Sequence, residues 1–344
     1  MSTAGCYPAS VAMLTNVQDL ENLLALPTPA DLDFMASRLK GDLIILGAGG
    51  KMGPTLVARA AAANCGRHKI YAVSRHGDFA PGVTVIRADL SDRKQVDALP
   101  DAPNVLFLVG RKFGSTGNEY LTWSTNTIVP ALCAERYADT SRIVALSTGN
   151  VYPFLPADSG GATEDTPPAP IGEYAWSALG RERVFESYAR QRGTAVTIIR
   201  LNYAVEPRYG TLVDIAEKVL TRRPVDLTTG YLNCIWQGDA NSVCLRAFDL
   251  CAAPAPAILN LTGTATLKVR DIAGAFGRRF GCEPILTGDE DPTALLNNAA
   301  KCARIFGEPP TALETMLDRI ADWLAQGGPT LGKPTHFEVR SGQF

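Results

Sequence analysis

The sequence lacks the features that mark membrane-spanning, disulfide-rich and metal-binding proteins. No apolar run approaches the roughly 18 residues that a membrane-spanning helix needs. The N-terminus has neither the basic start nor the long apolar stretch of a secretory signal. The eight cysteines are scattered without a CxxC pair, and the three histidines lie outside any metal-ligand spacing. These absences predict a reduced, cytoplasmic protein with no metal site and no membrane partner.

An excess of charge of either sign is also missing. The 344 residues include 33 Lys+Arg and 35 Asp+Glu, which gives a formal net charge of −2. Such a balance provides no broad basic field, so we expect no nucleic-acid partner. Apolar side chains, in contrast, are present in ordinary amount, at 46% of the chain against 20% charged residues. This composition is that of a folded globular protein with about two domains, or one large domain with additions.

From residue 42 onward, short apolar runs alternate with stretches of helical character. LIILG at 43–47, KIYAVS at 69–74 and NVLFLVG at 104–110 have the length and continuous hydrophobicity of strands buried on both faces. Similar runs occupy residues 83–90, 142–148, 195–202 and 258–263. Buried strands separated by helices are typical of a doubly wound, mostly parallel sheet. The sequence therefore predicts an α/β fold of the Rossmann type.

The two ends of the chain depart from this alternation. Apolar residues at helical spacing predict a helical N-terminal extension over residues 1–40. Such helices serve packing or oligomerisation, so a homodimer is among the expected partners. Residues 327–344 form a tail that is rich in Gly, Pro and Thr and has no clear period. Beyond residue 202 the alternation loosens, and helices are predicted at 211–222, 268–281 and 311–326.

A glycine-rich turn joins the first predicted strand to the helix that follows it. Gly47, Gly50 and Gly53 are spaced three apart in LIILGAGGKMGPTL, and Gly49 adds a fourth position without a side chain. Such glycines let the turn be tight and let a pyrophosphate approach the backbone N–H groups, while the helix N-terminus adds a favourable dipole. Because a strand precedes this loop and a helix follows it, we favour dinucleotide binding over a purely structural turn.

The end of the second predicted strand bears on the choice between NAD and NADP. An acidic residue at this place bonds the ribose 2′-hydroxyl of NAD, whereas an arginine accommodates the 2′-phosphate of NADP. No acid occupies positions 73–77, and Arg75 can face the phosphate. The sequence therefore predicts NADP in preference to NAD. The alternative is that Arg75 is a solvated loop residue and Asp78 serves the ribose.

Four landmarks follow one another in an order that resembles a known family. GAGGKMG, Asp89-Leu90, STGNVY at 147–152 and the helix that carries Tyr174 occur in the order seen in extended short-chain dehydrogenases/reductases, often called the NAD-dependent epimerase/dehydratase family. The resemblance runs from about residue 42 to about residue 323. It implies a Rossmann domain and a smaller C-terminal domain that binds the substrate. The corresponding ranges are 41–203 with 233–262 for the Rossmann domain, and 204–232 with 263–326 for the substrate domain.

The resemblance also implies a catalytic group of the Ser/Thr–Tyr–Lys type. Thr148 matches the hydroxyl that orients the substrate oxygen, and Ser147 is its neighbour. Tyr174 matches the general acid/base. The lysine of the family stands four residues after the tyrosine, where this chain has Ala178. That lysine holds the nicotinamide ribose and lowers the tyrosine pKa from about 10 by roughly three units, or about 4 kcal/mol, which alanine cannot do.

Two cations are candidates for the missing charge. Arg181 lies seven residues after Tyr174, two helical turns further on the same face. Lys112 follows the fourth strand, where the loop is expected to border the nicotinamide half of the cofactor. The alternative for each is a solvated surface charge.

The remaining site residues come from the loops after the strands. Substrate contacts are expected at Tyr203, Arg208 and Trp236, although a buried Trp is more often part of the core. The predicted cofactor site consists of Gly47, Gly49, Gly50, Lys51, Met52, Gly53, Ser74, Arg75, Asp89, Leu90, Val109, Gly110, Tyr174, Leu201 and Asn202.

Two functions are consistent with these features. The first is an NAD(P)-dependent oxidoreductase or epimerase that acts on a small molecule, such as a nucleotide sugar or another hydroxylated or carbonyl compound; Thr148 and Tyr174 favour it. The second is a non-catalytic NADP-binding sensor or scaffold, which Ala178 favours.

Overall fold

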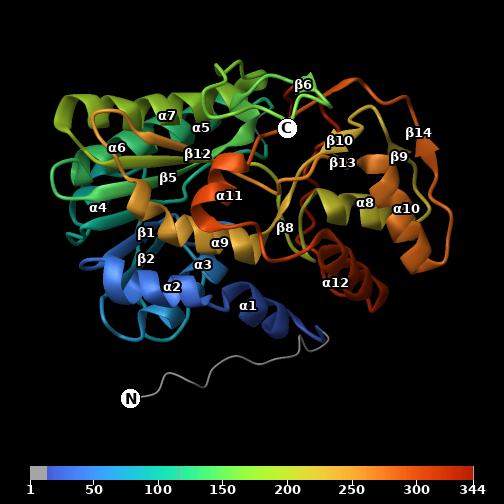
Figure 1. Ribbon diagram of the computed structural model, residues 1–344. Helices are drawn as coiled ribbons and strands as arrows, with labels where there is room; N and C mark the ends of the chain where they lie inside the picture. The colour runs from blue at the N-terminus through green and yellow to red at the C-terminus, as the bar shows by residue number, and fades with distance from the viewer. Residues whose placement is uncertain (1–13, 115, 344) are drawn as a thin grey trace.

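A seven-stranded parallel sheet forms the centre of the computed structural model, which describes residues 14–114 and 116–343 (Figure 1). The strand order is β12-β7-β5-β4-β1-β2-β3, so the chain starts in the middle and extends the sheet first to one side and then to the other. This doubly wound order confirms the predicted α/β fold of the Rossmann type. The strands are β1 Leu43–Leu46, β2 Ile70–Ser74, β3 Thr84–Arg87, β4 Asn104–Phe107, β5 Arg142–Thr148, β7 Val196–Leu201 and β12 Ala257–Leu261.

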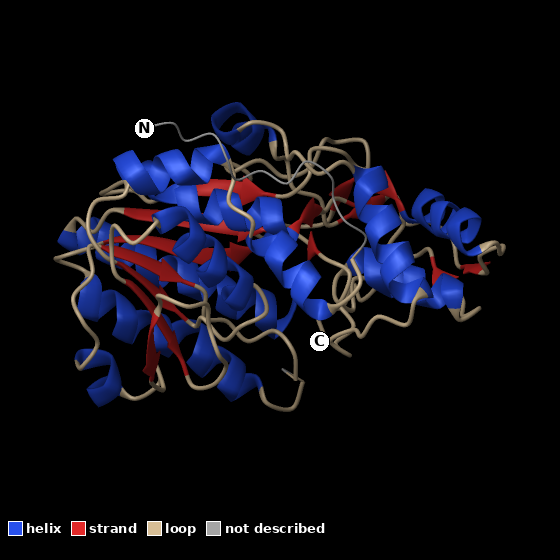
Figure 2. Ribbon diagram, turned by 90° about the horizontal axis from the view of Figure 1, so that it is seen from below, coloured by secondary structure: helices blue, strands red, loops and turns tan. Residues whose placement is uncertain are grey.

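Helices cover both faces of the sheet (Figure 2). In β1, Leu43 and Ile45 belong to the core under α3 and α9, whereas Ile44 and Leu46 belong to the core under α6 and α7. Successive side chains of a strand point to opposite faces, so a strand covered on both sides is apolar throughout. The covering helices are α3 Gly53–Asn64 and α9 Gln237–Arg246 on one face, and α4 Arg93–Asp97, α6 Val129–Tyr137 and α7 Gly172–Arg192 on the other.

The N-terminal segment is helical where the structure describes it. It contains α1 Val17–Ala25, α2 Pro29–Asp33 and the π-helical turn η1 Phe34–Arg38. Arg59 of α3 donates to the buried Asp31 carboxylate at 2.7 Å and so ties α2 to the main body of the protein. The predicted helical extension began at residue 1, and its first 13 residues lie outside the described part of the chain.

A smaller group of helices lies beside the sheet, on the right in Figure 1. Its core contains Ile215, Phe276 and Ile320 and is extended by Leu20 and Leu24 of α1. The three helices are α8 Thr211–Leu220, α10 Val269–Phe280 and α12 Leu313–Ala325, each within two residues of the range expected from periodicity. Among the described residues, no helix is both long and apolar enough to cross a bilayer.

Short elements complete the chain. The helical ones are α5 Glu119–Trp123, η2 Ser124–Ile128, η3 Gly149–Val151, η4 Ala247–Leu250 and α11 Ala300–Phe306. The two-residue strands are β6 Leu155–Pro156, β8 Ala204–Val205, β9 Val225–Asp226, β10 Tyr231–Leu232, β11 Ile235–Trp236, β13 Leu267–Lys268, β14 Leu286–Thr287 and β15 Thr293–Ala294.

Candidate functional site

The glycine loop divides into structural glycines and one glycine that faces open space. Gly47 has φ +81°, a conformation that suits a residue without a side chain. A Cβ at Gly49 would collide with Ser74 Oγ, and a Cβ at Gly53 would collide with the Ala48 carbonyl oxygen. A Cβ at Gly50 would meet only the Gly47 carbonyl oxygen, at 3.3 Å. Of these four glycines, therefore, Gly50 is the one whose missing side chain leaves room for a ligand instead of for the protein itself.

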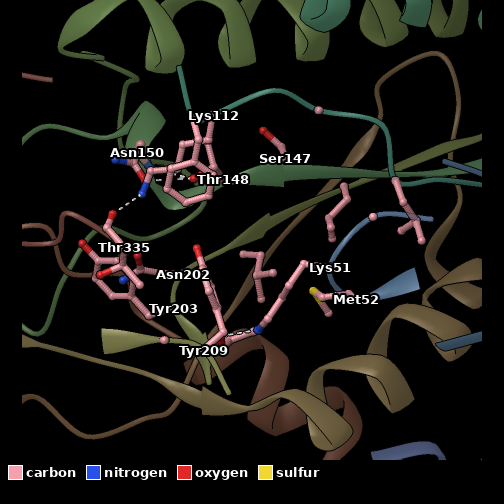
Figure 3. A pocket seen from close by; sticks show the side chains of 18 of the residues that line it. Lys51, Met52, Lys112, Ser147, Thr148, Asn150, Asn202, Tyr203, Tyr209 and Thr335 are labelled. Carbon is pink, nitrogen blue, oxygen red and sulfur yellow. Dashed lines mark hydrogen bonds between the residues drawn. The ribbon is translucent and has the colours of Figure 1, made fainter. Parts of the chain in front are cut away.

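A cavity of about 260 Å³ opens beside Gly50, at the carboxyl ends of β1, β4, β5 and β7. This is the edge at which ligands bind in open α/β sheets. Lys51 and Tyr209 lie at one end of the cavity, and Lys112, Asn150 and Thr335 lie at the other (Figure 3). The lining residues are Gly50, Lys51, Met52, Gly53, Leu108, Gly110, Lys112, Phe113, Leu146, Ser147, Thr148, Asn150, Tyr174, Arg181, Leu201, Asn202, Tyr203, Ala204, Tyr209, Gly210, Thr211 and Thr335.

The two hydroxyls at the end of β5 have different partners. Ser147 Oγ donates to the buried Glu182 carboxylate at 2.6 Å. That carboxylate also forms a buried ion pair with Arg200 at 2.7 Å, so the Ser147 hydroxyl belongs to a structural network. Thr148 Oγ1 donates to Asn150 Oδ1 at 3.0 Å and accepts from the Asn150 N–H at 3.2 Å. Asn150 lines the cavity too, so the Thr148 hydroxyl is held within a short turn at the cavity wall.

Tyr174 stands in the first turn of α7, and its side chain lines the cavity. The start of this helix is anchored to the loop after β4 by Asn126, whose amide donates to Ser177 Oγ at 2.9 Å and to the Arg111 carbonyl oxygen at 3.0 Å. The Asn126 side-chain oxygen accepts from the Arg111 N–H at 2.9 Å. Since Ser177 Oγ in turn donates to the Tyr174 carbonyl oxygen, one buried asparagine fixes the first turn of α7 against the sheet edge.

Arg181 is buried at the base of the cavity, 5% exposed, and is not a solvated charge. Its Nη1 donates to the carbonyl oxygens of Leu146, at 2.8 Å, and Val109, at 3.0 Å, at the ends of β5 and β4. A Cβ at Gly110 would lie 2.9 Å from this nitrogen, so Gly110 is glycine where the guanidinium needs space. Burial lowers the pKa of Arg181, and the neighbouring Tyr174 acts in the opposite direction. A cation therefore lies within electrostatic reach of the tyrosine, although Ala178 carries none.

Two lysines enter the cavity from opposite sides. Lys51 Nζ donates to the Ala204 carbonyl oxygen at 3.1 Å and lies 4.4 Å from the centre of the Tyr209 ring. Lys112 Nζ donates to the Thr335 carbonyl oxygen at 3.0 Å and lies 5.9 Å from the centre of the Tyr174 ring. Burial lowers the pKa of each lysine to about 8. Because none of the described lining residues is Asp or Glu, the cavity suits an anionic ligand.

The loop after β7 contributes aromatic residues. Tyr203 has a left-handed backbone with φ +47°, which is rare for a bulky residue and costs energy that the surrounding structure supplies. Burial raises the pKa of both Tyr203 and Tyr209, so both phenols stay neutral near pH 7. Asn202, directly before this strained residue, lines the cavity and donates to Asn233 Oδ1 at 2.7 Å.

Several predicted site residues lie away from the cavity. Arg208 is bound in ion pairs with Glu206 and Glu21, and Trp236 is 2% exposed within the core of the smaller helical group. Neither lines the cavity. Val109 supports the cavity through its backbone. Ser74, Arg75, Asp89 and Leu90 lie along the edge formed by β2 and β3, and Gly47 and Gly49 form the turn itself.

Some lining residues escaped the sequence-based prediction of site residues, among them Asn150, Tyr209 and Thr335. Asn150 stands two positions after Thr148 in STGNVY, and its proximity to the hydroxyls was a usable signal. Tyr209 follows the sixth predicted strand, where ligand contacts were expected at Tyr203 and Arg208. Thr335 comes from the C-terminal tail, which has no periodicity to interpret.

Solved structures share this fold at low sequence identity. UDP-glucuronic acid 4-epimerase from Bacillus cereus, in complex with UDP-glucuronic acid and NAD, is 17% identical to this chain and has a TM-score of 0.71. The match covers 83% of this chain and 99% of that one. UDP-glucose 4-epimerase from Thermus thermophilus, in complex with NAD, is 19% identical with a TM-score of 0.68, covering 82% and 98%. MoeE5 in complex with UDP-glucose and NAD is 20% identical with a TM-score of 0.66, covering 83% and 99%.

These neighbours correct the predicted preference for NADP. In all three the bound dinucleotide is NAD, and the prediction from Arg75 is therefore wrong. The structure offers a physical reason, because Arg75 is exposed and its charge acts on the Asp89 carboxyl, whose pKa is lowered chiefly by hydrogen bonds from Ser91 and to a smaller extent by Arg75. An arginine with a carboxylate nearby is no sign of a 2′-phosphate.

The family model agrees with the fold and with the resemblance found in the sequence. The model of the NAD-dependent epimerase/dehydratase family matches residues 43–226, which is more than half of the chain. A comparison of the sequence with curated proteins gives no significant match. The matched segment contains the glycine loop, the Thr148 turn and the Tyr174 helix. The chain belongs to the NAD-dependent epimerase/dehydratase family of the extended short-chain dehydrogenases/reductases.

Proposed function

We propose that the protein is an NAD-dependent epimerase or related oxidoreductase that acts on a nucleotide sugar or another hydroxylated or carbonyl small molecule. The observation that carries this proposal is the cavity that joins Gly50, Thr148 and Tyr174 at one edge of the sheet. Gly50 leaves open the space that a pyrophosphate requires, so the loop fits a dinucleotide. The NAD complexes of the structural neighbours support NAD as that dinucleotide.

In this proposal, Tyr174 is the acid/base. NAD would be held at the Gly50 loop, and its nicotinamide would supply the hydride acceptor for the substrate carbon and, in an epimerisation, the hydride donor. Tyr174 takes the proton of the substrate hydroxyl as the carbonyl forms and gives it back when the carbonyl is reduced, so charge and protons balance. Thr148 Oγ1 turns its one proton from Asn150 Oδ1 to the same substrate oxygen and orients it, while the Asn150 N–H still donates to Oγ1.

The charge that alanine removes is supplied from other positions. Arg181 is buried under the cavity, and Lys112 Nζ lies 5.9 Å from the centre of the Tyr174 ring. A cation near the phenol stabilises the phenolate, which is the form of Tyr174 that can accept a proton as a base. The guanidinium is fixed by two backbone carbonyls, so it is preorganised and needs no rearrangement during the reaction.

Positive charge and an unpaired hydroxyl support an anionic substrate. Lys51, Lys112 and Arg181 line the cavity together. Thr211, at the N-terminus of α8, has a buried hydroxyl without a hydrogen-bond partner among the described residues. A helix N-terminus and lysines suit a diphosphate, and α8 belongs to the part of the chain that we assign to substrate binding.

An exposed apolar patch supports a homodimer. Tyr120, Ile128 and Trp176 are 70%, 55% and 51% exposed, and they lie on α5, η2 and α7. Exposed aromatic residues on adjoining helices are enriched at protein interfaces. We therefore propose that two copies pair through α5 and α7.

A second candidate function is a dinucleotide-binding protein without catalysis, and the observation that favours it is Ala178. The enzyme and the binding protein are distinguished by comparing the wild type with Tyr174→Phe and Ala178→Lys. NADH formation or epimerisation is followed for each over a panel of UDP-sugars. Turnover by the wild type that falls about 10²–10⁴-fold in Tyr174→Phe supports the enzyme. Turnover that arises only in Ala178→Lys supports the binding protein. Activity of the wild type that Tyr174→Phe leaves unchanged refutes the role of Tyr174.

A further inference from the structure

The C-terminal tail connects the smaller helical group to the start of α7. Leu331 N–H donates to the Arg208 carbonyl oxygen at 2.9 Å, and Phe337 is buried in the core of the smaller group. Arg340 Nη1 donates to the Thr293 carbonyl oxygen at 2.8 Å. The tail, dark red in Figure 1, then packs against α7, where a Cβ at Gly172 would collide with a backbone oxygen of the tail. These contacts show that the tail is packed against the rest of the protein.

One residue of this tail reaches the cavity and is held from behind. Thr335 is buried, and both its backbone N–H and its hydroxyl donate to Asp214 Oδ2, at 2.8 Å and 2.5 Å. Asp214 stands in the first turn of α8 and is itself largely surrounded by protein. A carboxylate that accepts two hydrogen bonds from one residue fixes that residue in position and orientation.

The carbonyl oxygen of the same residue binds the cation of the cavity. Lys112 Nζ donates to the Thr335 carbonyl oxygen at 3.0 Å, and Figure 3 shows the two residues meeting at one end of the cavity. The Lys112 ammonium lies 5.5 Å from the centre of the Phe113 ring and 5.9 Å from that of Tyr174. The hydrogen bonds thus run from α8, through the tail, to a lysine beside the tyrosine of α7.

We propose that Thr335 and Asp214 are positioning residues that hold the Lys112 ammonium beside Tyr174, so that the C-terminal tail supplies part of the reactive site. This inference rests on the proposed function, since it concerns the proposed acid/base residue. It assigns a role to a segment that sequence patterns left unexplained. It also accounts for the location of a cation at the site when position 178 carries an alanine.

The pKa shifts of Lys112 and Asp214 agree with this arrangement of hydrogen bonds. Burial lowers the pKa of Lys112 to about 8, while Asp214 and Glu338 act in the opposite direction. Burial raises the pKa of Asp214 to about 6, while the hydrogen bonds from Thr335 act in the opposite direction. Between about pH 6 and pH 8, therefore, the carboxylate and the ammonium are both charged and the chain of hydrogen bonds is complete. The other titratable groups around these two are Glu338, Glu217, Lys218, Tyr174, Tyr203 and Tyr209.

The test compares wild type with Asp214→Asn and Thr335→Val in the full-length protein, with Thr330→Val of the same tail as the matched control. The apparent pKa of Lys112 is measured from the pH dependence of its acetylation by acetic anhydride, with mass spectrometry of the labelled peptide. Asp214→Asn removes the charge that raises this pKa, so we expect a fall of about half a unit to one unit. Thr335→Val removes the hydroxyl, which is one of the two donors that residue 335 directs at the Asp214 carboxylate. We expect a smaller fall in the pKa of Lys112 from this variant. Thr330→Val is expected to leave the value unchanged.

Kinetics provide the second measurement. We expect kcat to fall about 10-fold or more in Asp214→Asn and Thr335→Val, with KM for NAD changed by less than about 2-fold, because the cation is misplaced while the cofactor loop is intact. An unchanged Lys112 pKa in both variants overturns the inference, whatever the kinetics show. A wild type without turnover, combined with the expected pKa falls, overturns the proposed catalytic function but leaves the positioning of Lys112 established. Melting temperatures equal to that of Thr330→Val separate both outcomes from misfolding.

Discussion

Replacing Gly50 with valine separates the glycine that makes room for a ligand from the glycines that make room for the protein. A Cβ at Gly50 meets only the Gly47 carbonyl oxygen at 3.3 Å, and the residue is exposed with φ outside the left-handed region. We therefore expect the free energy of unfolding to fall by less than about 1 kcal/mol. The valine side chain, however, occupies the space at the cavity wall that a pyrophosphate needs. The affinity for NAD is expected to fall at least about 100-fold, or roughly 2.7 kcal/mol.

Gly53→Val is the matched comparison, since it makes the same change three residues further along the loop. Its Cβ would collide with the Ala48 carbonyl oxygen, a backbone atom that cannot move aside cheaply. Overpacking of this kind costs about 1–3 kcal/mol or more, so Gly53→Val is expected to lose stability along with binding. Urea unfolding gives the stability of both variants, and titration of NADH fluorescence gives the affinity. Unchanged NADH affinity in a folded Gly50→Val protein would show that the dinucleotide does not lie on this loop.

Four further outcomes follow from the site and its supports. Arg181→Met is expected to lower kcat about 10²-fold in steady-state assays and to cost roughly 1–3 kcal/mol of stability in urea, because two partly buried carbonyl oxygens lose their donor. Since the pKa of Lys51 is about 8, its ammonium is present below pH 8 and lost above it, so calorimetry should show that UDP binds more weakly as the pH rises through 8. Lys51→Met should remove the part of this pH dependence that comes from Lys51. Trp176→Glu should convert a dimer into a monomer in size-exclusion chromatography with light scattering, and a wild type that is already monomeric contradicts the proposed interface. Arg59→Met removes the closer of the two arginines that pair with the buried Asp31 carboxylate and leaves Arg246, at 3.4 Å. It should lower the free energy of unfolding by about 1–3 kcal/mol, and a smaller loss means that α2 is held by other contacts.

Local sequence patterns were sufficient to predict the strands of the sheet, the glycine loop and the position of Arg181 on its helix. A strand covered on both faces must be apolar throughout, so LIIL and its counterparts could be recognised one at a time. The glycine loop combines spacing with a strand before it and a helix after it, and all of that information lies within about 15 residues. Arg181 belongs to the same class, because a separation of seven residues places it on the helix face of Tyr174 wherever the helix packs.

Tertiary structure decided which charges serve the cavity and which serve each other. Arg75 and Arg208 carried the expected charge at the expected place along the chain, but one lies near Asp89 and the other pairs with Glu206 and Glu21. Glu21 is nearly 190 residues away from Arg208 along the chain. No local sequence pattern predicts a partner at that separation, because the pairing depends on how α1 packs against the smaller helical group.

The same reason explains Thr335, which no sequence feature singled out. Its position in the cavity depends on Asp214, 121 residues earlier, and its effect depends on Lys112, 223 residues earlier. By itself, the sequence determined the elements whose formation depends on neighbours along the chain: the buried strands, the glycine turn and the helix that carries Tyr174 and Arg181. Only the folded chain decided that Lys112 lies beside Tyr174, because electrostatic interactions depend on distance in space, and Lys112, Thr335 and Asp214 come together from a loop, a tail and a helix far apart in sequence.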